Sequence, residues 1–305
     1  MSTSPTPPAT RTSAPAVRET DAVALAVAVS VAEADTEADT ASVTEADAVS
    51  VTEAVAGKAV SGVGKQQRFP SGPAPDPAGS REEHRIRSFH ARRGRITQAQ
   101  AAAIERHWEA WGVELDGAPL DQGALFGDPE LPVVLEIGFG MGDATAAMAA
   151  ADPATGILAV DVHTPGQGNL LALADRLGLT NVRVANGDAV VLLRDMLPPA
   201  SLAGLRVYFP DPWPKAKHHK RRLIQPDFLA MVLPLLRPGA VVHCATDWEP
   251  YAEQMLEVLA AEPGLANRYP AEGFAPRPDF RPMTKFERQG LAKGHVVRDL
   301  LFTRI

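Results

Sequence analysis

Short, nearly continuous apolar runs recur between residues 133 and 246, and each is bounded by glycine, proline or polar residues. Such runs are typical of parallel strands that are buried on both faces of a sheet. They predict strands at 133–137, 156–162, 181–187, 205–209 and 240–246. Helix-favouring segments follow at 144–151, 168–177, 189–196, 225–236 and 249–261. This alternation predicts an α/β fold with a doubly wound, mostly parallel sheet.

Two flanking segments extend this pattern. Residues 98–111 read as a helix that begins after Thr97, with Trp108 and Trp111 on its apolar face and therefore packed against the core. The final segment, 295–304, alternates less cleanly and predicts an antiparallel edge strand, which is a common addition to such sheets.

The first 80 residues differ from the rest of the chain. They are rich in Ala, Thr, Ser, Pro, Val and acids, with Phe69 as the only aromatic residue, and this composition predicts a disordered tail before a domain at 81–305. The apolar patch 22–32 is too short to span a bilayer and lacks the basic residues that precede a signal-peptide core. We therefore expect a cytoplasmic protein. The lone Cys244 agrees with a reducing compartment and excludes a disulfide within the chain, and no metal site is expected.

The charge is unevenly distributed along the chain. Of the formal net charge of −7, residues 1–80 carry −5, so the predicted domain is nearly neutral. What matters for a polyanionic partner is clustering, and the domain has two basic clusters, at 81–95 and 215–222. The first reads equally well as a solvated linker or as an arm on phosphate.

Three glycines at alternate positions, Gly138, Gly140 and Gly142, follow the strand at 133–137 and precede a helix. Alternating glycines let a backbone pass close to a ligand. A dinucleotide-binding fingerprint would have its third glycine at position 143, but this position holds Asp143. Glu136 would also repel the pyrophosphate of a dinucleotide. A cationic cofactor without phosphate, S-adenosylmethionine, fits better.

Acids also close the next two strands. Asp161 could accept both ribose hydroxyls, and Asp188 could accept the exocyclic amine of an adenine. Each alone reads as a helix N-cap or a solvated loop acid. With Glu136 they form one constellation at the carboxyl edge of the sheet, where open α/β sheets bind ligands.

The strand at 205–209 runs into a stiff loop with three prolines, Pro210, Pro212 and Pro214, around Asp211 and Trp213. By the same sheet rule Asp211 lies beside the cofactor. The basic run that follows would hold phosphate at the entrance; a proline-rich turn with solvated charges is the plainer interpretation.

Five motifs together resemble the tRNA (guanine-N7-)-methyltransferase family. They span 135–142, 209–213, 220–222, 245–251 and 284–287, and the resemblance covers the chain from about residue 88 to the end. It implies the seven-stranded, Rossmann-like fold of class I S-adenosylmethionine-dependent methyltransferases. It also implies methyl transfer to N7 of guanosine 46 in the tRNA variable loop, with S-adenosylmethionine as the donor and tRNA as the partner.

The resemblance implies roles for individual residues. The cofactor is held by Glu136, the glycines, Asp161, Asp188 and Asp211, and Asp211 is also catalytic. The implied substrate-binding residues are Lys215, Lys217, His218, His219, Lys220, Arg221, Arg222, Asp247, Thr284, Lys285, Phe286 and Glu287. Asp247 or Glu287 could accept hydrogen bonds from the guanine N1–H and N2–H groups, and Trp213, Tyr251 and Phe286 could stack on the base.

Three other interpretations stay open at this point. A methyltransferase acting on an exocyclic amine would share the glycine turn, although its loop after the fourth strand usually has a different pattern. A nicotinamide oxidoreductase is disfavoured by Glu136 and Asp143. A non-catalytic RNA-binding protein of the same fold is disfavoured by the four acids 136, 161, 188 and 211. No membrane or obligatory protein partner is indicated.

Overall fold

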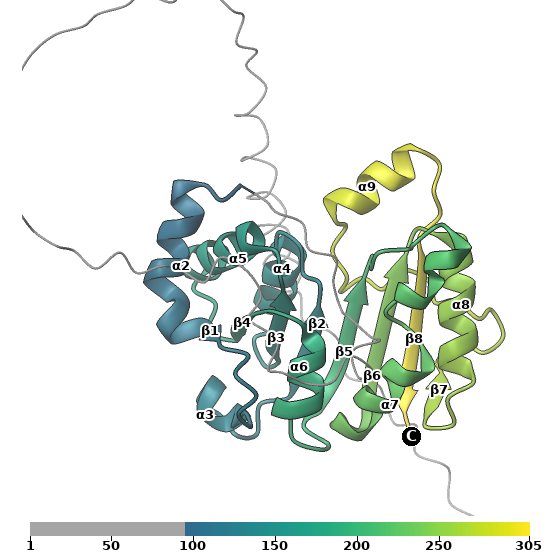
Figure 1. The fold of residues 1–305 in the computed structure, drawn as a ribbon, viewed down its shortest axis with the longest axis horizontal. Helices are drawn as coiled ribbons and strands as arrows, with labels where there is room; N and C mark the ends of the chain where they lie inside the picture. The colour runs from purple at the N-terminus through teal and green to yellow at the C-terminus, as the bar shows by residue number, and fades with distance from the viewer. Residues whose placement is uncertain (1–94) are drawn as a thin grey trace, which may run out of the picture.

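A computed structural model describes residues 95–305, with the side chains of Lys285 and Phe286 excepted (Figure 1). The predictions of a tail at 1–80 and of a basic arm beyond it therefore lie outside the described residues, except that Arg95, the last member of that arm, is exposed.

The described residues form one eight-stranded sheet in the order β1-β4-β3-β2-β5-β6-β8-β7. The strands are β1 (Gly112–Val113), β2 (Val133–Ile137), β3 (Gly156–Asp161), β4 (Val182–Asn186), β5 (Leu202–Tyr208), β6 (Leu236–Thr246), β7 (Leu265–Asn267) and β8 (Arg298–Arg304). Pairings among β1 to β6 are parallel, and β8 runs antiparallel to both β6 and β7. The doubly wound, mostly parallel sheet is confirmed, with β2 to β8 as its seven implied strands and the two-residue β1 added at one edge.

The antiparallel direction of the last strand is confirmed, but its expected position at the edge is wrong. The three-residue strand β7 pairs with β8 and covers its outer side. Strands as short as β1 and β7 carry too few residues for an alternation pattern, so the sequence did not predict them.

Helices cover both faces of the sheet (Figure 1). They are α2 (Gln98–Trp111), α3 (Gln122–Phe126), α4 (Asp143–Ala151), α5 (Thr164–Leu177), α6 (Ala189–Val191), α7 (Pro226–Val232), α8 (Glu249–Ala260) and α9 (Lys285–Ala292). Residues of α2, α4 and α5 form one buried cluster with one face of the sheet, and residues of α6, α7 and α8 form another with the opposite face. No helix between residues 95 and 305 is long and apolar enough to cross a membrane.

Strand β3 shows why its sequence is apolar throughout. Ile157 and Ala159 belong to the cluster under α4 and α5, whereas Leu158 and Val160 belong to the cluster under α6 to α8. Successive side chains of a strand point to opposite faces, so a strand covered on both sides needs apolar residues at every position.

Several helical features depart from the sequence pattern. The predicted helix at 189–196 is a three-residue α6 followed by a π-helix at Leu192–Met196. The predicted helix at 225–236 ends early, because a 3-10 turn at Leu233–Leu235 leads directly into β6. Helices α3 and α9 were not predicted at all, and α5 begins at Thr164, four residues before the predicted start. By contrast, Thr97 caps α2 as expected, in a capping box with Gln100.

The first turn of α5 lies against the glycine turn that follows β2. A Cβ atom built on Gly166 would come within 1.7 Å of the Gly140 carbonyl oxygen. The sequence offered no sign of this contact, because it joins residues 26 positions apart.

Gly166→Ala should therefore destabilise the fold by about 2 kcal/mol, since a side chain forced against backbone costs more than one forced against a flexible side chain. Urea unfolding followed by circular dichroism measures the change. Ala172→Ser, at an exposed position of the same helix, is the control. Equal unfolding midpoints for the two variants would contradict the role given to Gly166.

Candidate functional site

Acids stand at or just beyond the carboxyl ends of five neighbouring strands. In sheet order they are Asp188 after β4, Asp161 in β3, Glu136 in β2, Asp211 after β5 and Asp247 after β6. Because these strands run parallel, their carboxyl ends share one edge of the sheet. The sheet order thus brings together acids that lie as far as 111 positions apart in the chain.

The turn after β2 has the backbone that its glycines predict. Gly138, Gly140 and Gly142 have φ values of 80°, 62° and 81°, in the left-handed region that favours glycine. Cβ atoms built on Gly138 and Gly140 would meet no described atom within 4 Å, whereas one on Gly142 would clash with Leu170. The first two glycines therefore border open space, and the third allows close packing of α4 against α5.

Asp161 ties the end of β3 to this turn. Its carboxylate accepts hydrogen bonds from the backbone N–H groups of Gly140 (2.9 Å) and His163 (3.0 Å). Burial raises the pKa of Asp161, although these hydrogen bonds act in the opposite direction. Gln167, a buried residue of α5, donates to the Asp161 carbonyl oxygen and to the Asn186 side chain, and so joins β3 to β4.

Glu136 is buried at the centre of the sheet. One carboxylate oxygen accepts from the Thr145 hydroxyl at 3.0 Å, and the other has no hydrogen-bond partner among residues 95–305. Arg206 is its cross-strand neighbour on β5. Burial raises the pKa of Glu136 to about 7, and the charge of Arg206 only partly offsets that rise. A buried carboxylate oxygen without a partner is costly, so this site favours a cationic ligand.

Asp188 is the N-cap of α6, where its side chain accepts from the Val190 backbone N–H at 3.0 Å. The capping interpretation of this acid is therefore confirmed. A carboxylate has about four acceptor positions, so a capping role does not by itself exclude a ligand.

The proline-rich loop after β5 is held in an uncommon backbone conformation. Phe209 and Trp213, on either side of Pro210–Pro212, have φ values of 50° and 46°. Bulky residues adopt positive φ only where their surroundings enforce it, and such strain clusters at functional sites. The backbone is thus constrained on both sides of Asp211, which restricts the position of its side chain.

Arg222 supplies part of that enforcement, and its expected contact with RNA is wrong for this structure. Its side chain is only 3% exposed. Its guanidinium donates to the carbonyl oxygens of Pro212 (2.8 Å) and Pro250 (3.3 Å) and to the side chain of Gln254, and it stacks on the Tyr251 ring. Tyr251 is fully buried, so it is not available for the expected base stacking either.

The other cations of the basic run face solvent. Lys215, Lys217, Lys220 and Arg221 are exposed on or beside a 3-10 turn at Ala216–Arg221, whereas His218 and His219 are half-buried. The guanidinium of Arg221 lies 4.9 Å from the centre of the Trp213 ring. Partial desolvation of the ring, followed by the positive charges of the neighbouring cations, lowers the pKa of His218. This exposed positive surface begins at the end of the Asp211 loop.

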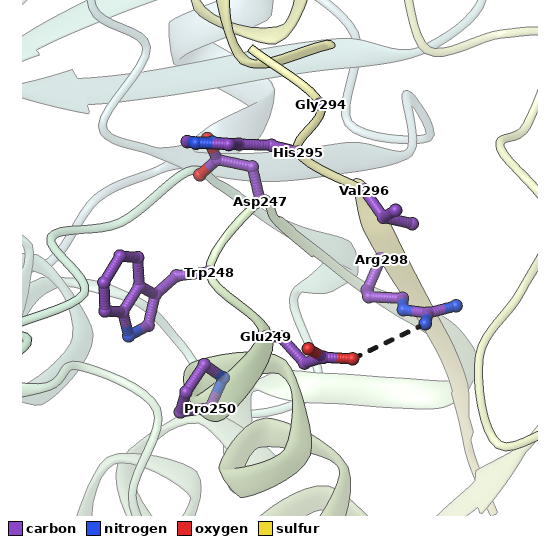
Figure 2. Close-up of a pocket in the computed structure, with 8 residues that line it drawn as sticks. All are labelled: Asp247, Trp248, Glu249, Pro250, Gly294, His295, Val296 and Arg298. Carbon is purple, nitrogen blue, oxygen red and sulfur yellow. Dashed lines mark hydrogen bonds and ion pairs between the residues drawn. The ribbon is translucent and has the colours of Figure 1, made fainter.

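Asp247 lines a pocket of about 360 Å³ between the start of α8 and the segment that joins α9 to β8 (Figure 2). His295 lies beside it, with its Nδ1 atom 2.9 Å from a carboxylate oxygen of Asp247. Trp248 forms one wall, and Arg298 pairs with Glu249 at 3.8 Å farther along. Both Asp247 and His295 remain partly exposed.

Helix α9 contributes the last predicted motif. Thr284 is its N-cap and accepts from the Glu287 backbone N–H at 3.1 Å. Glu287 is only 1% exposed and forms a two-point ion pair with Arg281, so its expected direct contact with the guanine is wrong for this structure. The side chains of Lys285 and Phe286 lie outside those described.

Several residues of this region were missed by sequence reasoning. Gln167, Arg206, Arg281 and His295 are single polar residues without a motif, and each has a partner on another element at least 18 positions away. Thr145, nine positions after Glu136 at the start of α4, was also missed, although it lies close to Glu136 in the sequence. Within residues 95–305, no group of three or more His, Cys, Asp or Glu residues is placed to hold a metal ion.

Comparison with known proteins gives consistent matches. Residues 130–300 match the family model Methyltransf_4, described as "Putative methyltransferase". A tRNA (guanine-N(7)-)-methyltransferase of Streptomyces avermitilis is 69% identical over 240 residues, which are 79% of this chain and 82% of the relative. The corresponding proteins of Streptomyces coelicolor (67% identity, 79% and 89%) and Bordetella pertussis (53%, 76% and 89%) match similarly. Among solved structures, TrmN from Thermus thermophilus is 18% identical with a TM-score of 0.40, covering 68% of this chain and 48% of that one.

Arg222→Ala should lower the free energy of unfolding by about 3 kcal/mol, because buried carbonyl oxygens and Gln254 lose their donor. Arg221→Ala, an exposed neighbour, should change it by less than about 0.5 kcal/mol. Urea unfolding of both variants measures the difference. If Arg222→Ala were as stable as Arg221→Ala, the buried clamp on the Asp211 loop would be refuted.

Proposed function

The chain belongs to the tRNA (guanine-N(7)-)-methyltransferase family, and we propose that its target is guanosine 46 in the variable loop of tRNA. It is an S-adenosylmethionine-dependent enzyme, and this cofactor supplies an electrophilic methyl group on a sulfonium. The observation that carries the proposal is the row of acids at adjacent strand ends, which includes Asp211 in a strained loop beside exposed cations.

The residues present fit this cofactor. The open space over Gly138 and Gly140 leaves room for a ligand to approach the backbone, and the unpartnered oxygen of Glu136 suits an ammonium group. Asp161 keeps acceptor capacity beyond the two hydrogen bonds that its carboxylate makes, and Asp188 follows the neighbouring strand β4 at the same edge. We assign Glu136, Asp161, Asp188 and the glycine turn to cofactor binding.

The main task of the protein in this reaction is to align guanine N7 with the methyl group of the cofactor. Guanine N7 carries a lone pair in the plane of the base and no proton, so the protein need not supply a general base. Holding N7 about 3 Å from the methyl carbon can account for several kcal/mol of barrier lowering. The methylated purine gains positive charge, and a fixed carboxylate near it stabilises that charge as it develops.

We assign this electrostatic role to Asp211. Its loop is stiffened by Pro210, Pro212 and Pro214, strained at Phe209 and Trp213 and clamped by Arg222. A carboxylate held in this way needs little reorganisation when charge develops nearby.

The exposed cations Lys215, Lys217, Lys220 and Arg221 are assigned to the tRNA phosphates. Asp247, with His295 beside it, is assigned to the donor edge of the guanine, N1–H and N2–H. Trp213, which is flanked by Arg221 and His218, is assigned to stacking on a base. A cytoplasmic location, where tRNA is made and used, and action without a protein partner belong to the same proposal.

Methyl transfer from labelled S-adenosylmethionine to unmethylated tRNA, followed by nucleoside separation, tests the target. Label should appear in 7-methylguanosine from the variable loop, and a tRNA with adenosine at position 46 should take up none. Asp211→Asn should lower kcat by about 10²-fold, the usual effect of losing one fixed electrostatic group. Asp227→Asn, at an exposed position of α7, is the control; label at another nucleoside would overturn the target.

Cofactor binding should strengthen as pH rises from 6 to 8. The pKa of Glu136 is raised to about 7, so the carboxyl is protonated below that value and charged above it. A cationic ligand prefers the charged form, and affinity should rise about tenfold from pH 6 to the plateau above 7. Calorimetry with wild type and Glu136→Gln measures this, and the variant should keep only the ligand's own titration. An identical pH profile for both proteins would refute the role of Glu136.

A further inference from the structure

Arg281 is fully buried and holds two carboxylates at once. Its Nη1 and Nη2 atoms donate to Glu287 at 2.6 and 3.0 Å, and its Nε and Nη2 atoms donate to Asp299 at 2.8 Å each. The first carboxylate belongs to α9 and the second to β8. One guanidinium therefore joins a short surface helix to the interior of the sheet.

The network continues into the strands that end at the site. Asp299 accepts from His243 on β6 at 2.7 Å, and the other ring nitrogen of His243 lies 2.8 Å from the Tyr208 hydroxyl on β5. Burial lowers the pKa of His243, so a neutral ring donates through Nε2 to Asp299 and accepts from Tyr208 through Nδ1. One tautomer satisfies the whole chain of hydrogen bonds.

Arg281 also touches the base of the Asp211 loop. Its guanidinium carbon lies 5.9 Å from the Tyr208 ring centre and 5.8 Å from that of Phe209, the residue with φ of 50° that precedes Pro210. The same side chain thus reaches both α9 and the base of the Asp211 loop. Figure 1 shows α9 standing over the carboxyl ends of β5 and β6.

Stability alone is a weak reason for such an arrangement. Withdrawing one arginine and two carboxylates from water is costly, and apolar residues of similar volume often stabilise a fold as well or better. What a buried two-sided ion pair does provide is a fixed geometry between the elements it joins. Arg277, at the surface, adds a second cation 3.2 Å from Glu287 and balances the charge of the group.

We propose that Arg281 is a positioning residue that sets α9 relative to the Asp211 loop, and that Glu287 acts through Arg281 and does not touch the guanine. The carboxylate left to accept from the guanine edge is Asp247. This inference rests on the proposed function for its kinetic consequences, but the anchoring itself is a property of the protein alone.

Both oxygens of Glu287 are engaged by cations, and the side chain is almost fully shielded. Asp247 differs in each respect: it is one-third exposed, lines the pocket, and only one of its oxygens is bonded within the part of the chain described. Gly290 of α9 packs closely against that bonded oxygen of Asp247: a Cβ atom built on this glycine would lie 3.0 Å from it. The position of α9 therefore determines how Asp247 is presented.

The test uses the full chain with Arg281→Lys, Arg281→Met, Glu287→Gln and the double variant Arg281→Met/Glu287→Gln. Arg277→Met removes the surface cation from the same Glu287 and is the matched control. Hydrogen exchange of the α9 amides is measured without tRNA, with β4 amides as an internal reference. Cofactor affinity, kcat and KM for tRNA are then measured well below each melting temperature.

We expect α9 amides to exchange at least tenfold faster in both Arg281 variants, with β4 unchanged, and faster in the lysine variant than in Arg277→Met. We expect KM for tRNA to rise about tenfold in Arg281→Met and Glu287→Gln alike, with cofactor affinity within twofold of wild type. Since the two residues act as one unit, the double variant should be no worse than either single variant.

Single effects that multiply in the double variant would show that Glu287 contacts substrate independently, and would overturn the proposal. So would unchanged α9 exchange in Arg281→Lys, or a loss of cofactor affinity equal to the loss for tRNA, which would indicate general damage. If Arg281→Met does not fold, Arg281→Lys and Glu287→Gln replace it in the comparison. Failure of the wild type to methylate tRNA would refute the proposed function, while the exchange measurement would still decide the anchoring.

Discussion

Covering both faces of a parallel sheet with helices is the constraint on which the rest of this structure depends. A strand such as β3, packed under α5 on one side and under the π-helix Leu192–Met196 on the other, has no position along its length for a solvated polar group. The acids are therefore found at the edge where the strands end, because parallel pairing puts those ends together. A polar residue inside a strand, such as His243 of β6, is buried and has hydrogen-bond partners at both ring nitrogens. The acids from Asp188 to Asp247 form a row for this reason.

At that edge, the carboxylates have two kinds of surroundings: some are paired with buried cations, and one is not. Glu287 and Asp299 are neutralised by Arg281, and the hydrogen bonds from His243 and Arg281 outweigh burial and hold the pKa of Asp299 below its ordinary value. Glu136 receives one hydrogen bond, from Thr145, and the charge of its neighbour Arg206 offsets burial only in part, so burial raises its pKa instead. Satisfied carboxylates stabilise a geometry, whereas an unsatisfied one is ready to bind a cation.

The Asp211 loop shows how the interior supports a strained segment. Positive φ at Phe209 and Trp213 is unfavourable for such bulky residues, and two buried arginines lie against the loop from different sides. Arg222 donates to Pro212 from the α8 side, and Arg281 lies over Phe209 from the α9 side. Contacts outside the loop therefore offset the free-energy cost of its strained backbone.

The sequence alone determined the strands β2 to β6, most of the helices and the glycine turn, because apolar periodicity and glycine positions are local properties. It also determined that Glu136, Asp161, Asp188 and Asp211 lie at one edge, since parallel pairing follows from that alternation. Only the tertiary structure decided which members of the basic run face solvent, because Arg221 and Arg222 are adjacent in sequence and opposite in burial. Only it decided that Glu287 pairs with Arg281 and that His295 pairs with Asp247, since packing among β6, β8 and α9 brings together residues that no local pattern connects.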